Sequence, residues 1–228
     1  MRYNTFIMIH FENVSKLYDG KDESLKDVTF SVEAGEFVSL VGHSGAGKTT
    51  IMKLITAEEH PTNGEIYFDE EPIHDFKRSY IPKHRRRIGT IFQDFQLLPQ
   101  KTVYENVAFA MEVAGKSDKE IKSDVPYALE LVNLGDKELR FPHQLSGGEK
   151  QRLAIARAII NQPDVILADE PTGNLDSVAS HDVVQILKKI NELGTTIIVA
   201  THDSEVIKLL HNRVITLEKG EIISDSKK

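Results

Sequence analysis

The chain is predicted to adopt an α/β fold: a mixed β-sheet core with an N-terminal antiparallel β-subdomain and an inserted α-helical subdomain. Two continuous apolar runs, 165–169 and 195–201, are typical of parallel strands covered on both faces. Residues 102–160 show a mostly helical pattern of apolar positions. Segments near the N-terminus are instead rich in alternating apolar and β-branched side chains, as antiparallel strands are.

The individual elements follow from the same patterns. Strands are expected over 7–18, 26–42 and 64–70, the last of them after a turn-forming segment that begins at Pro61. A helix is expected over 177–194, because apolar side chains recur there at helical spacing and a glycine ends the pattern.

The length of 228 residues suits a single domain with a sub-lobe. We expect residues 1–94 and 161–228, approximately, to form the catalytic core together with the β-subdomain. Residues 95–160, approximately, are expected to form the inserted helical subdomain.

Composition and charge exclude several classes of protein. The chain has no cysteine, which excludes disulfides, thiolate catalysis and zinc–thiolate sites and fits a reducing compartment. A net charge of -7 gives no global indication of nucleic-acid binding. No apolar run approaches the roughly 18–20 residues that span a bilayer, and residues 1–10 make a poor signal peptide. A cytoplasmic protein is therefore expected, held at any membrane by another protein.

A glycine-rich segment between an expected strand and an expected helix has the spacing of a phosphate-binding P-loop. Its glycines allow the backbone to approach phosphates closely, and the helix that follows directs free N–H groups at the anion. A lysine supplies a charge to the β- and γ-phosphates, and the next hydroxyl can bind Mg²⁺. The predicted core is therefore a P-loop NTPase (RecA-like) fold; a glycine-rich strand–helix turn without a ligand is the alternative. The expected cradle is Gly42, His43, Ser44, Gly45, Ala46, Gly47, Lys48, Thr49 and Thr50.

Two carboxylates end the apolar run 165–169 and its continuation. Ligands of open α/β sheets lie beyond the carboxyl ends of the strands. We expect Asp169 to hold Mg²⁺ through a bridging water molecule, and Glu170 to orient and activate the attacking water. Solvated acids at a strand end are the alternative.

Two further polar residues follow expected strands. His202 comes after the run 195–201 and can polarise the γ-phosphate or the attacking water. Gln93 follows a strand-like segment, and its amide can bridge Mg²⁺ and that water. Taken singly, His202 is better explained by a structural hydrogen bond and Gln93 by an ordinary surface role.

A second anion site is predicted far from the first in the sequence. Ser146, Gly147 and Gly148 begin a long helical run, so a hydroxyl, bare backbone amides and a helix dipole converge there. One nucleotide does not need two phosphate sites on one chain. A dimer does, if each nucleotide lies between the cradle of one chain and the second anion site of the other.

Together these segments resemble the ABC ATPase family, in the order expected and over almost the whole chain, from Ile9 to Ser224. The matching motifs are Walker A (42–50), the Q-loop (Gln93), the signature (145–152), Walker B (165–170), the D-loop (173–176) and the H-switch (His202). The resemblance implies ATP and Mg²⁺ as ligands, and a homodimer that sandwiches two nucleotides.

The resemblance also implies roles that the residues alone do not give. Tyr18 matches the aromatic residue that stacks on adenine, although a strand-edge tyrosine is the alternative. Ser146, Gly147 and Gly148 would contact the γ-phosphate bound by the other subunit. Asp176 would lie at the seam of the dimer.

Segments 12–18, 35–50, 85–113 and 169–176 are most similar to the cell-division branch of the family. That branch acts with an integral membrane protein that controls peptidoglycan hydrolases, at the inner face of the cell membrane. ATPases of lipoprotein-releasing or macrolide exporters are the main alternative. Soluble family members that act on DNA or ribosomes, and modules that bind ATP but barely hydrolyse it, are the others.

The basic run 83–87 has three interpretations: a solvated face, a contact with anionic lipid or a membrane partner, and, least favoured by the acidic net charge, a nucleic-acid site.

Overall fold

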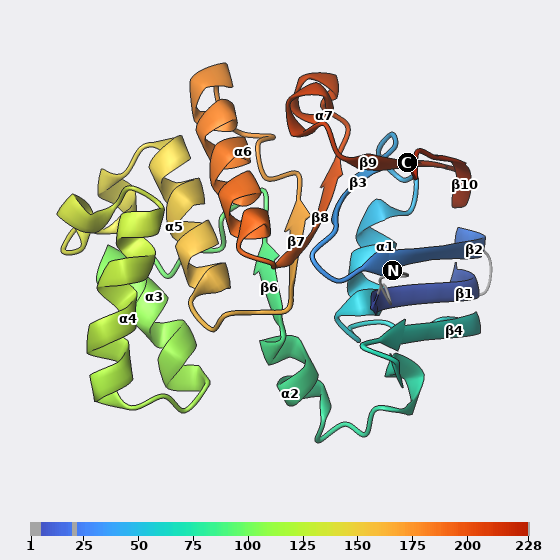
Figure 1. Cartoon of the computed structure of the whole chain (residues 1–228), viewed down its shortest axis with the longest axis horizontal. Helices are drawn as coiled ribbons and strands as arrows, with labels where there is room; N and C mark the ends of the chain where they lie inside the picture. The colour runs from blue at the N-terminus through green and yellow to red at the C-terminus, as the bar shows by residue number, and fades with distance from the viewer. Residues whose placement is uncertain (1–5, 20–21, 228) are drawn as a thin grey trace, which may run out of the picture.

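The computed structural model describes residues 6–19 and 22–227 (Figure 1). The central sheet has the order β10–β9–β3–β8–β7–β6, parallel throughout except that β10 runs antiparallel to β9. It is therefore the mixed sheet that the sequence predicts. Its strands are β3 (Phe37–Val41), β6 (Ile88–Ile91), β7 (Val165–Asp169), β8 (Thr196–Thr201), β9 (Arg213–Glu218) and β10 (Glu221–Asp225).

A second sheet is antiparallel and lies on the opposite side of the molecule from helices α3 and α4 (Figure 1). Phe11 and Phe30 pair across its first two strands with ring centroids 4.7 Å apart. Its strands are β1 (Ile7–Tyr18), β2 (Asp22–Glu33), β4 (Asn63–Phe68) and β5 (Glu71–Pro72). We call this sheet the β-lobe.

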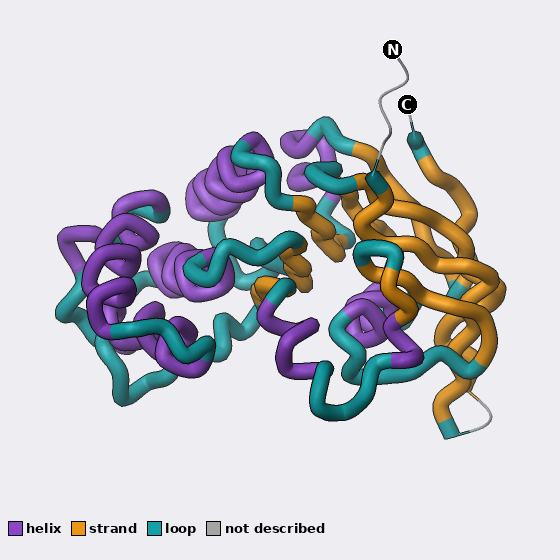
Figure 2. Tube along the Cα trace, turned by 60° about the horizontal axis from the view of Figure 1, so that its bottom comes forward, coloured by secondary structure: helices purple, strands orange, loops and turns teal. Residues whose placement is uncertain are grey.

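Helices α3, α4 and α5 lie together on the other side of the molecule, whereas α1 lies against the β-lobe (Figure 1 and Figure 2). The proposed helical subdomain, 95–160, includes α3, α4 and α5. The helices are α1 (Lys48–Ile55), α2 (Ile81–Arg86), α3 (Val103–Val113), α4 (Asp118–Leu131), α5 (Gly147–Ile159), α6 (Ser177–Glu192) and α7 (Ser204–Leu210). Short 3₁₀ turns cover Ile73–Asp75, Gly135–Lys137 and Pro142–Gln144. No helix among residues 6–19 and 22–227 has the length and apolar character needed to cross a membrane.

The central strands are buried on both faces, which explains their continuous apolar runs. Successive side chains point to opposite faces of a sheet, so each strand contributes to two cores. One core contains Val165, Leu167, Ile198 and Ala200, together with α1 and the β-lobe. The other contains Ile166, Ala168, Ile197 and Val199, together with α3–α6.

The strand region expected over 26–42 requires a correction. It forms two strands, β2 and β3, which belong to different sheets. The chain turns between them at Gly35, whose φ of 73° lies in the left-handed region that glycine adopts readily. The apolar pattern continues through the turn because both strands face cores, so the pattern alone does not mark the break.

Candidate active site

The glycine-rich segment joins β3, in the central sheet, to the start of α1. Gly47 has a φ of 107° and caps the helix without any side-chain hydrogen bond. A Cβ atom at this position would lie 2.6 Å from Leu25 Cδ2 and 2.8 Å from the Ser24 carbonyl oxygen, so only glycine fits. The first N–H groups of α1 have no helical acceptor, and no side chain caps them; they therefore suit an anion.

Lys48 is held across this loop. Its side chain is only 8% exposed, and its ammonium donates to the carbonyl oxygens of Gly42 at 2.6 Å and His43 at 3.2 Å. The two carbonyl groups therefore fix the charge above the backbone amides. The same ammonium lies 4.0 Å from Oε1 of Glu170.

Thr49 and Asp169 come from different elements and meet at this point. The Thr49 hydroxyl donates to Oδ2 of Asp169 over 3.2 Å. The pKa of Asp169 lies above its usual value, and burial is the main cause. The hydrogen bond from Thr49 acts to lower this pKa, and the neighbouring Glu170 carboxylate acts to raise it. A divalent cation would offset the cost of this buried negative charge. A hydroxyl and a carboxylate are hard oxygen donors of the kind that Mg²⁺ prefers, so the two residues fit that ion.

Glu170 turns away from Asp169 because its backbone leaves the strand. Its φ is 47°, in the left-handed region that few non-glycine residues adopt, and such strain is concentrated at functional sites. Its N–H donates to the Ala200 carbonyl oxygen at 2.9 Å, which ties the turn to β8. The two consecutive acids have different partners: Thr49 contacts Asp169, and His202 contacts Glu170.

The Glu170 carboxylate is oriented by residues at the end of β8. Nδ1 of His202 lies 2.7 Å from Oε1 of Glu170. The imidazole is the donor in this hydrogen bond, since an ionised carboxylate has no proton to donate. Thr201 donates to Oε2 at 3.5 Å. The Glu170 side chain is 15% exposed and that of His202 is 68% exposed, so the imidazole remains open to a ligand.

Gln93 is joined to a residue that sequence reasoning did not single out. Its Nε2 donates to Oδ1 of Asn174 at 3.4 Å, and Nδ2 of Asn174 donates to the Gln93 carbonyl oxygen at 3.0 Å. Ser24 was also missed: its hydroxyl lies 2.7 Å from that of Thr50. Asn174 lies inside the D-loop motif, which was a usable signal, whereas Ser24 lies in no motif.

These groups line one open pocket of about 700 Å³. It brings together the predicted His43, Ser44, Gly45, Ala46, Gly47, Lys48, Thr49, Thr50, Gln93, Asp169, Glu170 and His202, together with Ser24, Phe92, Asp94 and Asn174. Gly42 does not line it but contributes the carbonyl oxygen that holds Lys48. A carboxylate, an imidazole, an amide and an ammonium therefore face one cavity beside a helix N-terminus.

Besides Gly42, five predicted residues do not line this pocket. Tyr18 ends β1, half-buried, with the Lys16 ammonium 4.9 Å from its ring centroid. Ser146, Gly147, Gly148 and Asp176 belong to a second surface, where α5 and α6 begin.

That second surface is formed by two helix starts in contact. Ser146 caps α5 and accepts from the Glu149 N–H at 3.3 Å, while the Glu149 carboxylate accepts from the Ser146 N–H at 2.8 Å. Hydrogen bonds from Lys137 first, and then from the Ser146 N–H, lower the pKa of Glu149. Asp176 caps α6 by accepting from the Ala179 N–H at 2.8 Å.

The two helix starts are packed so closely that a Cβ on Gly148 would lie 2.8 Å from that of Ala179. Residues 145–152 and the D-loop 173–176 are therefore in contact through α5 and α6, and the D-loop also reaches the pocket that holds Lys48 through Asn174.

Residues 25–173 match the family model described as ABC transporter. The chain belongs to the ABC transporter family. The geometry above shows how its motifs are distributed: Walker A, Walker B, the Q-loop and the H-switch share a pocket, and the signature does not.

Curated relatives cover nearly the whole chain. The chain is 48% identical over 218 residues to the cell division ATP-binding protein FtsE of Bacillus subtilis, a match that covers 96% of each chain. It is 47% identical over 215 residues to FtsE of Escherichia coli, covering 94% of this chain and 97% of that protein. It is 46% identical over 223 residues to FtsE of Mycobacterium tuberculosis, covering 97% of each.

Solved structures of similar sequence have the same fold. The dimeric structure of MJ0796, a bacterial ABC transporter cassette, superposes with a TM-score of 0.86 at 40% identity, over 96% of this chain and 98% of that one. A dimeric post-hydrolysis state of MJ0796 bound to ADP and Pi gives 0.86 at 39% identity, with the same coverage. Family and fold together identify the chain as an ABC-type ATPase.

Proposed function

We propose that the chain is the ATP-hydrolysing subunit of a membrane complex that acts in cell division. The observation that carries this proposal is the identity of 48%, 46% and 47% to three FtsE proteins, over nearly the full length of both chains in each case. A likeness confined to the nucleotide motifs would support the chemistry alone. One that includes the segments outside those motifs supports a shared role.

Within the pocket, each residue has a proposed part in the hydrolysis of Mg-ATP. Lys48 and the N–H groups of α1 bind the β- and γ-phosphates. Thr49 and Asp169 hold Mg²⁺, with Gln93 beside them. Glu170, oriented by His202 at 2.7 Å, takes the proton of the attacking water. Catalysis is then a matter of positioning and charge stabilisation.

The active unit is proposed to be a homodimer in which two nucleotides are sandwiched. The N–H groups of Gly147 and Gly148 lie in the first turn of α5, where helix geometry provides no acceptor. The Ser146 hydroxyl accepts from Glu149 but retains its own proton for a phosphate oxygen. These donors lie outside the pocket of their own chain. We therefore infer that they bind the γ-phosphate of a nucleotide held in the pocket of a second copy.

The dimer is tested by light scattering after size exclusion, with Mg²⁺ and a non-hydrolysable ATP analogue. We expect the wild-type chain to dimerise with the analogue and Ser146→Arg to remain monomeric while still binding it. Ser117→Arg is a matched control, because Ser117 caps α4 with the same reciprocal hydrogen bonds to a glutamate three residues on. A dimer of Ser146→Arg as stable as that of the wild type would refute the sandwich.

The proposed partner is an FtsX-like integral membrane protein, which would hold the chain at the inner face of the cell membrane and control peptidoglycan hydrolases. Nucleic acid is not expected as a partner. Affinity purification from membranes, followed by mass spectrometry, tests this proposal. Recovery of an FtsX-like protein supports it, whereas recovery of a lipoprotein-releasing or macrolide-type permease would assign the chain to an exporter.

A further inference from the structure

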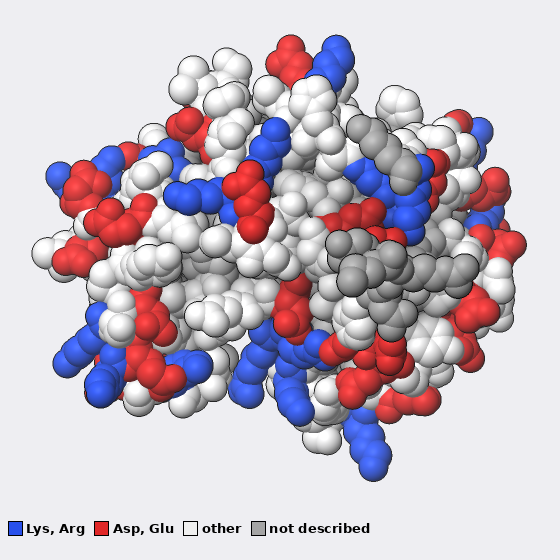
Figure 3. All heavy atoms as spheres, in the orientation of Figure 1, with Lys and Arg blue, Asp and Glu red and all other residues white. Residues whose placement is uncertain are grey.

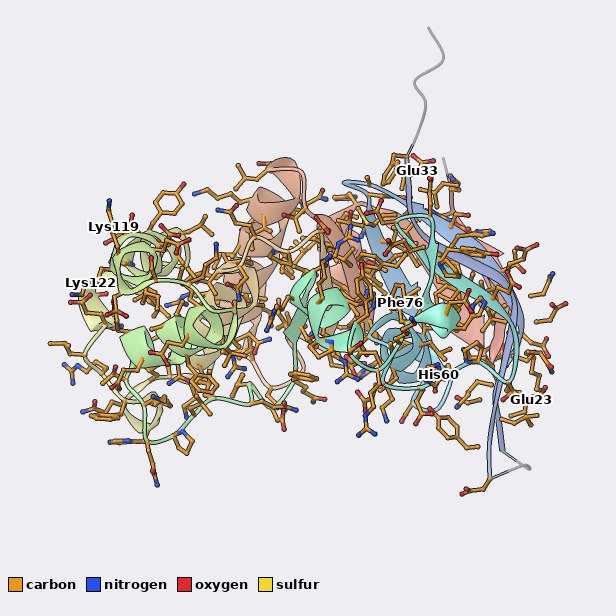
Figure 4. All side chains as sticks on the ribbon, turned by 90° about the horizontal axis from the view of Figure 1, so that it is seen from below. Glu23, Glu33, His60, Phe76, Lys119 and Lys122 are labelled. Carbon is orange, nitrogen blue, oxygen red and sulfur yellow. The ribbon has the colours of Figure 1, made fainter. Side chains whose placement is uncertain are left out.

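The basic run 83–87 is more than a solvated face, although Figure 3 shows Lys and Arg side chains gathered over α2. His84 is 1% exposed, and its ring packs against Phe68 and Phe76 with centroids 4.8 Å and 4.9 Å away. Phe76, labelled in Figure 4, belongs to the segment between the β-lobe and α2. Arg87 bridges Asp69 and Asp164, which anchors the end of α2.

Two members of the run cap the far end of the phosphate-loop helix. His84 Nε2 lies 2.7 Å from the Ile55 carbonyl oxygen and must donate, since a carbonyl group only accepts. Arg85 donates from Nε to the Thr56 carbonyl oxygen at 3.0 Å and from Nη2 to that of Ala57 at 3.1 Å. Three consecutive carbonyl groups at the C-terminus of α1 are thus bound from α2.

This cap acts on the end of α1 opposite the nucleotide. The helix is short, Lys48–Ile55, which at 1.5 Å per residue is about 12 Å long. Its core-facing side chains, including Ile51 and Leu54, are fully buried, and a helix of this length is a single rigid element. A shift at Ile55 therefore displaces Lys48 and Thr49 at the other end. A cation at the C-terminus also stabilises the helix dipole.

We propose that His84 and Arg85 are positioning residues for the phosphate loop: by fixing the C-terminal end of α1 they hold Lys48 and Thr49 where the phosphates bind. Neither residue lines the nucleotide pocket, although Arg85 lines an adjoining cavity that Thr49 and Asp169 also border. The proposed effect is transmitted through α1, and a variant that keeps the charge of Arg85 separates it from a direct effect of that charge. The inference rests on α1 being the phosphate-binding helix of the proposed function.

Arg86 provides a matched control on the same helix. Arg85 and Arg86 are both exposed and line the same groove against α3. Arg86 donates to the Val113 carbonyl oxygen at 3.3 Å and, within the part of the chain that the structure describes, does not hydrogen-bond to α1. Removing it changes the charge of α2 by the same amount without uncapping the helix.

The experiment measures ATP affinity by calorimetry, and KM and kcat by steady-state hydrolysis, on the full chain. We expect Arg85→Ala to raise both Kd and KM by roughly three- to tenfold, from the loss of two hydrogen bonds to helix-terminal carbonyl groups. Arg86→Ala should leave both within a factor of two. Arg85→Lys keeps the charge but cannot form the forked pair, so its Kd should lie between those of the wild type and Arg85→Ala.

A role confined to stability would give a different pattern. Arg85→Ala would then lower the melting temperature but leave Kd and KM unchanged, and that result would overturn the proposal. An equal rise in Kd for Arg86→Ala would also overturn it. His84→Gln retains a donor for Ile55 and checks the second contact if His84→Ala does not fold. A wild-type chain that binds no ATP would instead refute the proposed function.

Discussion

Replacement of Glu170 by glutamine removes one negative charge from the pocket and changes its shape very little. An amide oxygen can still accept from Nδ1 of His202, which lies 2.7 Å from Oε1 of Glu170. What is lost is the ability to take a proton from water. Loss of a general base typically lowers the rate by about 10²–10⁴-fold, which corresponds to about 2.7–5.4 kcal/mol of transition-state stabilisation at 1.36 kcal/mol per tenfold.

Binding should respond in the opposite direction. The Glu170 carboxylate lies 4.0 Å from the Lys48 ammonium, so it offsets part of the charge that the phosphates meet. Its removal should leave ATP affinity unchanged or higher. Single-turnover hydrolysis and calorimetry measure the two effects separately. Glu120→Gln, on an exposed side chain of α4, is the control. Hydrolysis by Glu170→Gln within a factor of ten of wild type, or a clear loss of affinity, would refute the assignment.

Three further changes test other parts of the structure. Lys48→Ala should raise the Kd for ATP at least tenfold in calorimetry, because it removes the ammonium fixed over the loop; an unchanged Kd would contradict the cradle. Gly47→Ala places a Cβ 2.6 Å from a leucine at a φ of 107°, so the melting temperature should fall measurably without nucleotide. Arg213→Met breaks a partly buried ion pair whose side chains are 7% and 29% exposed, at a cost of about 1–3 kcal/mol, which corresponds to about 2–12 °C in melting temperature. Arg213 also lowers the pKa of Asp225 in the folded chain. This carboxylate therefore stabilises the fold above about pH 4, the ordinary pKa of an aspartate in the unfolded chain, and the stabilisation is lost as the pH falls through the lower folded pKa. Thermal melts from pH 2.5 to 5 should show this acid-dependent loss of stability in the wild type and not in Arg213→Met.

The parts of the site that sequence predicts are those whose chemistry is local. Gly47 and Lys48 must follow one another at fixed spacing because one loop wraps one phosphate chain. Asp169 and Glu170 are recognisable because a fully buried strand ends in two acids, and parallel strands deliver their carboxyl ends to a common edge. In both cases a few consecutive residues contain the whole signal.

The missed parts depend on contacts between distant segments. Ser24 reaches Thr50 from β2, and nothing around it in the sequence marks it. In the sequence, the basic run 83–87 indicates a solvated surface, because consecutive charged side chains are usually exposed. In the structure, Ile55 and its two successors supply the acceptors, and Asp69 and Asp164 supply the counter-charges. No local pattern indicates which carbonyl groups a buried histidine will meet.

Tight packing of α5 on α6 adds a constraint to any mechanism. Gly148 leaves no space for a methyl group against Ala179, and Asp176 begins the helix that Ala179 belongs to. A γ-phosphate bound at Ser146 would therefore bear directly on the turn that contains Asp176. That turn also contains Asn174, which is hydrogen-bonded to Gln93 in the pocket of the same chain. Under the proposed sandwich, occupancy of the second surface by one nucleotide would thus be connected, through α6 and Asn174, to the site where the chain would hold its own.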